Sequence, residues 1–86
     1  MDIIVHKDFL KQYRKLTINQ QKNFKKRRDL FVKNPFHPIL KNHRLEGKFS
    51  GYHSINIAGD LRVIYKEIND KTVVFAAIGT HDQLYS

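Results

Sequence analysis

The longest β-forming part of this chain is Tyr52–Gly79, with the sequence YHSINIAGDLRVIYKEINDKTVVFAAIG. It holds three runs rich in β-branched and aromatic residues, at 52–58, 61–68 and 72–79. Such runs predict strands, because these side chains pack well on a pleated, half-buried surface. Two short turn-forming junctions separate the runs, so we expect each strand to pair antiparallel with the next. The junctions are Ala58-Gly59-Asp60 and Asn69-Asp70.

Alternation within the runs indicates which side chains share a face of the sheet, because successive residues of a strand point to opposite sides. In the first run His53, Ile55 and Ile57 share one face, and Tyr52, Ser54 and Asn56 share the other. In the second run Leu61, Val63 and Tyr65 oppose Arg62, Ile64 and Lys66. One face must pack on helices, and the other is left partly open.

The N-terminal half supplies those helices. Asp2–Val5 is a short strand-like start, and an apolar stripe at helical spacing follows it. Thr17 and Gln20 have the spacing of a capping box, so a second helix begins there and ends before Asn34-Pro35. The segment 35–48 is a loop. The apolar stripe that follows Val5 and predicts the first helix consists of Phe9, Leu10, Tyr13 and Leu16.

This order, βααβββ, predicts an α+β fold in which an antiparallel sheet packs against an N-terminal helix hairpin. With 86 residues, the chain has room for one modest core, so we expect residues 1–86 to form a single domain. Cysteine is absent, which excludes disulfides, thiolate metal sites and a cysteine nucleophile. The N-terminus carries no apolar run of signal-peptide length, so we expect a cytoplasmic protein.

The net charge of +8 favours a polyanionic partner. Ten of the sixteen basic residues lie in residues 1–34, beside three of the eight acidic ones. The densest block is Lys25-Lys26-Arg27-Arg28. Such a block is commonly a solvated helix face, but its positive field would also attract a polyphosphate backbone.

Five histidines are the residues best suited to acid–base chemistry. His6 and His37 fit solvated structural roles, and His53 shares a strand face with isoleucines and fits a packed role. His43 and His81 lie outside the expected helices and strands, beside small or polar neighbours. No His-Glu-x-x-His pattern or phosphate-binding glycine loop is present, so we expect no metal and no cofactor.

Three segments resemble the YafQ-like branch of the RelE/ParE toxin superfamily. The first is Asn42–Tyr52, NHRLEGKFSGY, which looks like that branch's loop; the second is Asp60–Tyr65, DLRVIY, which resembles its central strand. The third and most specific is Ile78–Tyr85, IGTHDQLY. The resemblance covers the whole chain and implies the toxin of a type II toxin–antitoxin pair, a ribosome-dependent mRNA endonuclease. Its partners would be an antitoxin protein, the ribosome and mRNA.

The resemblance assigns catalytic roles to five residues. His43 and His81 match histidines of the branch, Asp60 matches an acid, Tyr85 stands where an aromatic residue is found, and Arg62 matches an arginine that binds the scissile phosphate. Where the branch usually carries a second strand histidine, this chain has Asn56, which can bind RNA but cannot transfer a proton. The tryptophan that usually follows the acid is replaced by Leu61.

Metal-free RNA cleavage fits these residues, because the substrate's own 2′-OH is the nucleophile. The protein then needs a base, an acid and cations around the phosphorane. We assign proton transfer to His81 and Asp60, with His43 as a second acid–base or phosphate-binding group. The predicted RNA-binding residues are Asn56, Lys48, Lys25, Lys26 and Arg28. The alternatives are a ParE-like inhibitor of DNA gyrase, a degenerate homologue that only binds an antitoxin, and a scaffold whose histidines only pack or face solvent.

Overall fold

A five-stranded sheet forms the centre of the computed structural model, which describes residues 1–85. Its strand order is β1-β5-β4-β3-β2, with β1 parallel to β5 and the other neighbours antiparallel. The predicted antiparallel pairing of the three central strands is confirmed. The strands are β1 (Asp2–Val5), β2 (His43–Arg44), β3 (His53–Ala58), β4 (Leu61–Asn69) and β5 (Thr72–Thr80).

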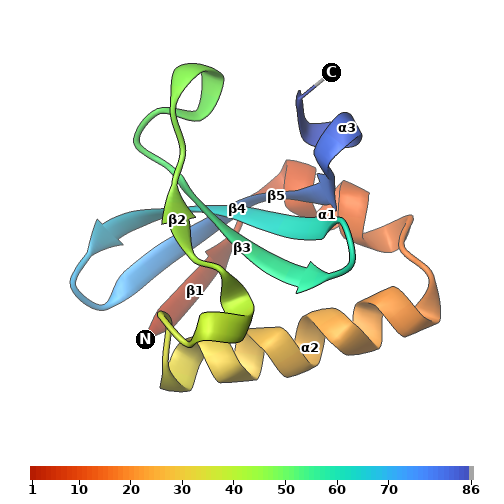
Figure 1. Cartoon of the computed structure of the whole chain (residues 1–86), viewed down its shortest axis with the longest axis horizontal. Coiled ribbons are helices and arrows are strands. Elements are labelled where there is room, and N and C mark those ends of the chain that lie inside the picture. The colour runs from red at the N-terminus through yellow and green to blue at the C-terminus, as the bar shows by residue number, and fades with distance from the viewer. Residues whose placement is uncertain (86) are drawn as a thin grey trace.

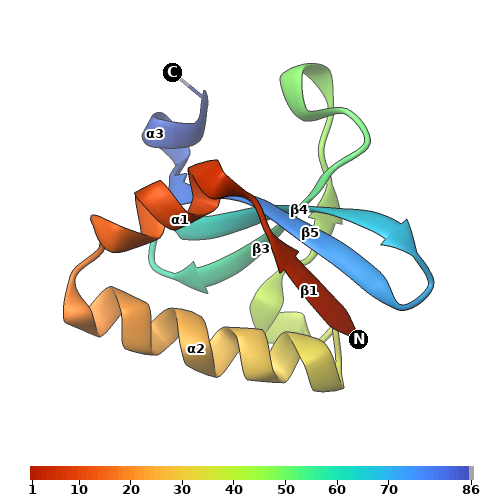
Figure 2. The ribbon, with the colours of Figure 1, turned by 180° about the vertical axis from the view of Figure 1, so that it is seen from behind.

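Two helices, α1 (Lys7–Arg14) and α2 (Ile18–Lys33), cover one face of this sheet (Figures 1 and 2). The predicted capping box starts α2, because Thr17 Oγ1 accepts from the Gln20 amide at 3.1 Å and Gln20 Oε1 accepts from the Thr17 amide at 2.9 Å. His6 caps α1 by accepting a hydrogen bond from the Asp8 amide. Helix α2 ends at Lys33, just before Asn34-Pro35, as expected.

The core is aromatic and centres on the fully buried Phe75 of β5. Its ring lies 5.8 Å from Phe9 of α1, 6.0 Å from Phe24 of α2 and 5.8 Å from Phe31 of α2, measured between centroids. The strand faces that contain Ile55, Ile57, Leu61, Val63 and Tyr65 pack on the helices, and Ser54 and Ile64 on the other face are also buried. His53 is partly buried and stacks on Tyr65, with centroids 5.1 Å apart, which confirms its packed role.

The register between β4 and β5 shifts after Ile64, which pairs with Ala77, whereas Tyr65 pairs with Phe75. Ala76 is therefore the extra residue of a β-bulge. The bulge lets Phe75 and Ile78, three positions apart, both enter the core. Strict alternation would place these two residues on opposite faces, and the bulge was not predicted from the sequence.

The opposite face of the sheet, called the open face below, is only partly covered: Ser54 and Ile64 are buried on it, and two segments rise beside it (Figure 1). One is the stretch between β2 and β3, with a short 3₁₀ turn, η2 (Gly47–Phe49); the other is the C-terminal helix α3 (His81–Tyr85). The loop expected over 35–48 is more ordered than predicted, since it also holds the turn η1 (Pro38–Leu40) and β2. Within residues 1–85, no helix is long and apolar enough to cross a membrane.

Tyr65 provides a stability test of this core. Burial raises the pKa of its phenol above the ordinary value of 10.0; the hydrogen bond from Asn42 opposes the shift and Glu67 adds to it. Since the folded state favours the neutral phenol, its contribution to stability is complete below about pH 10 and is lost as pH rises through the raised pKa. In urea unfolding, the wild type should lose more stability between about pH 8 and pH 11 than Tyr65→Phe.

At neutral pH the Tyr65→Phe variant should be less stable by about 0.5–1.5 kcal/mol. It lacks the hydroxyl that accepts a 2.8 Å hydrogen bond from Asn42 Nδ2, although that amide also donates to the Pro35 carbonyl. If both proteins lose the same stability between about pH 8 and pH 11, ionisation of Tyr65 does not destabilise the folded state.

Candidate active site

A pocket of about 140 Å³ lies on the open face of the sheet and contains three of the predicted site residues. His43 comes from β2, Asn56 from β3 and Arg62 from β4. Asn56 pairs with Arg62, and His43 pairs with Ser54, so the strand register brings these side chains to one face. The full lining is Lys41, His43, Ser54, Asn56, Gly59 and Arg62.

His43 is held in one tautomer. Its Nδ1 lies 2.8 Å from the carbonyl oxygen of Lys41, and because a carbonyl can only accept, Nδ1 must carry the proton. In the neutral ring Nε2 is then the basic nitrogen. Lys41 adopts a left-handed conformation, with φ of 48°, at the end of η1. This turn presents its carbonyl to the ring, and His43 is therefore oriented by the backbone.

Arg62 is a largely buried cation, and at least one of its N–H donors has no hydrogen-bond partner among the described residues. Its side chain is 25% exposed, and Nη2 lies 3.0 Å from Asp60 Oδ1. Its Nε is buried without a hydrogen-bond partner among the described residues. Across the sheet it pairs with Gly79 of β5, and the space beside that glycine is occupied by the side chains of Gln83 and Leu84. A phosphate in the pocket would match the planar donor set of this guanidinium.

Asp60 links the two halves of the site. One carboxylate oxygen, Oδ1, accepts from Arg62, and the other, Oδ2, accepts from the backbone amide of His81 at 3.1 Å. The sequence assigned Asp60 to proton transfer. In this structure both of its oxygens hold neighbouring groups in place, which suits a positioning role; proton transfer by Asp60 stays a prediction.

His81 is more ordered than the sequence suggested. We expected it outside the helices and strands, but it opens α3, just as His43 opens β2. A second capping box holds this helix, since Thr80 Oγ1 accepts from the Gln83 amide at 3.3 Å and Gln83 Oε1 accepts from the Thr80 amide at 2.9 Å. The exposed His81 ring stacks on Tyr85, with centroids 4.7 Å apart. The sequence signal, Thr-x-x-Gln, was the same one that marked the start of α2.

Asn56 helps to shape the pocket. Its amide donates a 2.9 Å hydrogen bond to the Gly59 carbonyl within the turn between β3 and β4. The side chain that replaces the branch's histidine thus contributes to the turn, and RNA binding by Asn56 stays a prediction. Within residues 1–85, no three His, Cys, Asp or Glu side chains gather closely enough to hold a metal ion.

The other predicted RNA-binding residues lie outside this pocket. Lys48, in η2, directs its Nζ to the Leu84 carbonyl at 3.5 Å. Lys25, Lys26 and Arg28 belong to α2, on the opposite side of the sheet (Figure 1). They cannot touch the same phosphate as Arg62. Any RNA that they bind is a different segment or a different molecule.

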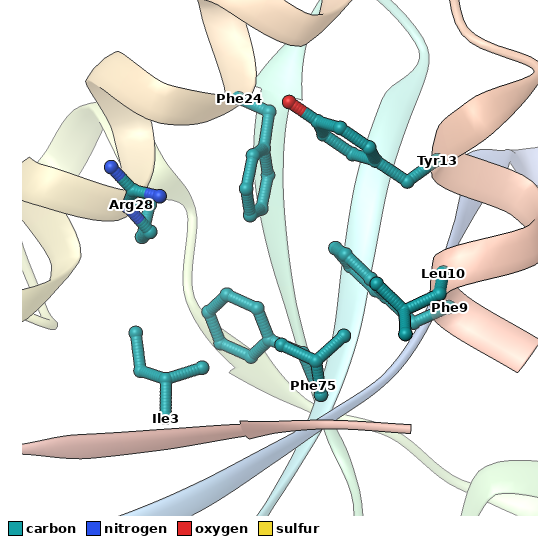
Figure 3. A pocket seen from close by; sticks show the side chains of 8 residues that line it. Ile3, Phe9, Leu10, Tyr13, Phe24, Arg28 and Phe75 are labelled. Carbon is teal, nitrogen blue, oxygen red and sulfur yellow. The ribbon is translucent and has the colours of Figure 1, made fainter. Parts of the chain in front are cut away.

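Arg28 also has a structural environment of its own. It pairs with Asp29 at 3.2 Å, and its guanidinium carbon lies 5.8 Å from the centroid of the Phe24 ring. Figure 3 shows it at a largely apolar pocket of about 310 Å³ between α1, α2 and β1, beside Ile3 and Phe24.

Three residues near the site were not singled out by the sequence: Phe49, Tyr52 and Lys66. Phe49 contacts Tyr85 edge-on, with centroids 5.4 Å apart, and Lys66 Nζ lies 5.5 Å above the Tyr52 ring. Strand alternation placed Tyr52 with Ser54, and Lys66 with Arg62. Only the pairing of β3 with β4 shows that the Tyr52–Ser54 row and the Arg62–Lys66 row lie side by side.

The comparison with protein families agrees with this geometry. The family described as "Bacterial toxin of type II toxin-antitoxin system, YafQ" matches residues 1–86. The chain belongs to the YafQ toxin family. The fold class and the resemblance expected from the sequence are thereby confirmed.

Known members of the YafQ family show how far the likeness extends. The mRNA interferase toxin YafQ of Escherichia coli (strain K12) is 35% identical over 51 residues, which are 59% of this chain and 54% of that protein. The match thus spans about half of the relative's length. The crystal structure of YafQ from E. coli strain BL21(DE3) superimposes with a TM-score of 0.74 at 27% identity, over 99% of this chain and 98% of that one. YafQ in the crystal structure of the E. coli DinJ-YafQ complex superimposes with a TM-score of 0.67 at 27% identity, over 99% of this chain and 98% of that one.

Gly79 offers a test of how α3 is positioned. A Cβ at this buried position would stand 2.9 Å from Gln83 Oε1 and 3.3 Å from Gln83 Cβ, so Gly79→Ala should displace the side chain that caps α3. We expect a loss of about 0.5–2 kcal/mol, the usual value of an N-terminal cap. The ring resonances of His81 and Tyr85 should shift in NMR spectra.

The matched control is Gln83→Ala, which removes the cap without adding a methyl group. If displacement of Gln83 is the cause, Gly79→Ala should cost much less stability in the Gln83→Ala background than alone. Fully additive losses would contradict this explanation.

Proposed function

We propose that this protein is the toxin of a type II toxin–antitoxin pair, acting in the cytoplasm as a ribosome-dependent, metal-independent endoribonuclease on translated mRNA. The observation that carries the proposal is the linked set on the open face. Arg62 and His43 line one pocket, and Asp60 joins Arg62 to the backbone of His81. Membership of the YafQ family and the likeness to a protein named mRNA interferase support it.

The chemistry requires no group beyond these side chains and the RNA. A base takes the proton of the 2′-OH, and the 2′-oxygen attacks the adjacent phosphorus. The bond from phosphorus to the 5′-oxygen then breaks, and an acid protonates that oxygen. The products are a 2′,3′-cyclic phosphate and a 5′-hydroxyl end, so no water is consumed in this step.

Each residue has a role that its geometry suits. Arg62 stabilises the negative charge on the phosphorane, as its fixed planar donors suit phosphate oxygens. His43, with Nε2 as its basic nitrogen, and His81, exposed beside Tyr85, are the two proton-transfer groups. Asp60 positions Arg62 and His81. Tyr85 stacks on or hydrogen-bonds to a nucleotide.

The basic face of α2 serves a second partner. Lys25 and Lys26 are exposed on the side of the sheet away from the pocket. With mRNA on the open face, this helix can contact ribosomal RNA without competing for the active site. A toxin clamped between two RNA molecules in this way would act best on mRNA that is already on the ribosome.

An antitoxin is the expected protein partner. The E. coli relative is found in a DinJ-YafQ complex. In this chain the apolar pocket between α1, α2 and β1 has Arg28 in its lining and Lys25 in the same helix (Figure 3). An amphipathic, acidic segment would match both its apolar lining and its charge.

A catalytically degenerate, antitoxin-binding homologue is the second candidate, and one observation favours it. Asn56 stands where the branch usually has a histidine, and its amide is engaged in a turn. The ParE-like gyrase inhibitor has no comparable support, because gyrase binding would not require the pocket that holds His43 and Arg62.

His81→Ala should lower mRNA cleavage in a cell-free translation system by about 10²–10⁴-fold, the usual contribution of a general acid or base. The fragments that the wild type produces should carry 5′-hydroxyl ends. His6→Ala is the matched control, since His6 caps α1 and lies outside the site. Cleavage at the wild-type rate by folded His81→Ala would remove this residue from the mechanism, and absence of cleavage by the wild type would favour the degenerate homologue.

Reversing Lys25 and Lys26 to Glu should weaken sedimentation with ribosomes while sparing the pocket. Each lost phosphate contact should also reduce the salt slope of binding by about 0.7–0.9. Arg28 is left intact, because its partly buried side chain pairs with Asp29. The control reverses Lys7 and Lys71, two exposed lysines outside α2. If the α2 variant pellets with ribosomes as well as the wild type across a salt series, the helix is only a solvated face.

A further inference from the structure

Aromatic rings and lysines alternate along one edge of the open face. Phe49 lies 6.2 Å from Tyr52 and 5.4 Å from Tyr85, measured between ring centroids, and both contacts are edge-on. Lys48 Nζ lies 5.3 Å from the Phe49 centroid, and Lys66 Nζ lies 5.5 Å from the Tyr52 centroid. We call Phe49, Tyr52, Lys48 and Lys66 the aromatic strip.

The strip is continuous with the catalytic residues at both ends. Tyr85 joins it to His81, on which Tyr85 stacks. Tyr52 lies on the strand face of Ser54 and Asn56, two residues of the pocket lining. Tyr52 directly precedes β3, and at about 3.4 Å per extended residue it lies roughly 14 Å from Asn56 along the chain, which leaves room for more than one nucleotide beside the scissile phosphate.

The composition of the strip suits single-stranded RNA. Proteins that bind single strands combine aromatic rings, on which bases stack, with cations that follow the phosphates. Phe49 and Tyr52 are both partly exposed, as a stacking surface requires, and Lys48 and Lys66 are exposed. If Phe49 and Tyr52 served only to pack the loop between β2 and β3 against α3, lysines above their rings would not be needed.

We propose that Phe49 and Tyr52 form a base-stacking subsite for the single-stranded RNA that flanks the scissile phosphate, with Lys48 and Lys66 contacting the neighbouring phosphates. This inference rests on the proposed function and names how its substrate is held. The subsite positions the strand, while bond cleavage belongs to His43, Arg62 and His81.

The test measures binding of a short single-stranded RNA heptamer with 2′-O-methyl riboses, which prevent attack by the 2′-oxygen. Phe49→Leu and Tyr52→Leu keep apolar bulk but remove the ring. Each should weaken binding by about 5- to 150-fold, the usual effect of losing one stacked base. Tyr52→Phe and Phe49→Tyr keep a ring and should bind like the wild type. Phe36→Leu is the matched control, because Phe36 is 68% exposed between α2 and η1.

A second set of heptamers, each with one abasic position, separates stacking from a structural effect. At one position, loss of the base should weaken binding to the wild type but add little to the defect of Phe49→Leu or Tyr52→Leu. Additive losses at every position, or wild-type affinity of both leucine variants, would overturn the subsite. Thermal unfolding identifies any variant that fails to fold, and the other leucine variant then carries the test.

The outcomes also separate this inference from the proposed function. A wild type that cleaves translated mRNA, with leucine variants that bind and cleave equally well, contradicts the subsite alone. A wild type that binds the heptamer through both rings but cleaves no mRNA supports the subsite and contradicts the nuclease. A wild type that binds no heptamer contradicts the subsite, whereas the nuclease proposal is decided by cleavage of translated mRNA on the ribosome.

Discussion

The β-bulge at Ala76 is the constraint on which the two faces of this molecule depend. It shifts the pairing of β5 with β4 so that Phe75 and Ile78 both enter the core. The same shift turns Gly79 to the open face, opposite Arg62. Without the extra residue, either the core would lose an apolar side chain or the position against which Gln83 and Leu84 of α3 pack would no longer be a glycine on this face.

Asp60 then connects the sheet to the C-terminal helix. Its carboxylate accepts hydrogen bonds from Arg62 and from the amide of His81, while the Thr80–Gln83 capping box fixes the same end of α3. The placement of His81 therefore depends on an acid twenty-one positions earlier in the chain. A short helix that would be unstable alone is held by a residue that also forms an ion pair with Arg62.

The distribution of charge follows from the layers of the fold. The helices bury their aromatic side chains against the sheet, and α2 lies on the side of the sheet away from α3 (Figure 2), with Lys25 and Lys26 exposed. The protein consequently presents two separate cationic surfaces, one lined with potential catalytic groups and one without them. This division fits an enzyme that binds its substrate strand on one side and a larger RNA on the other.

The sequence by itself determined the order of β1, α1, α2, β3, β4 and β5, the capping box at Thr17, the side chains that share a face of β3 and β4, and the family. These features depend on local spacing. The two-residue period of strands, the 3.6-residue period of helices and the capping motifs can all be recognised without knowing any distant contact. The bulge, the edge pairing of β1 and β2, and the contacts among Asp60, Arg62 and His81 were decided only by tertiary structure. They depend on strand register and on chain segments far apart, and a one-residue change in register exchanges the two faces of a strand. For the same reason the sequence named Lys25 and Lys48 together as RNA-binding residues, whereas the fold places them on opposite sides of the sheet.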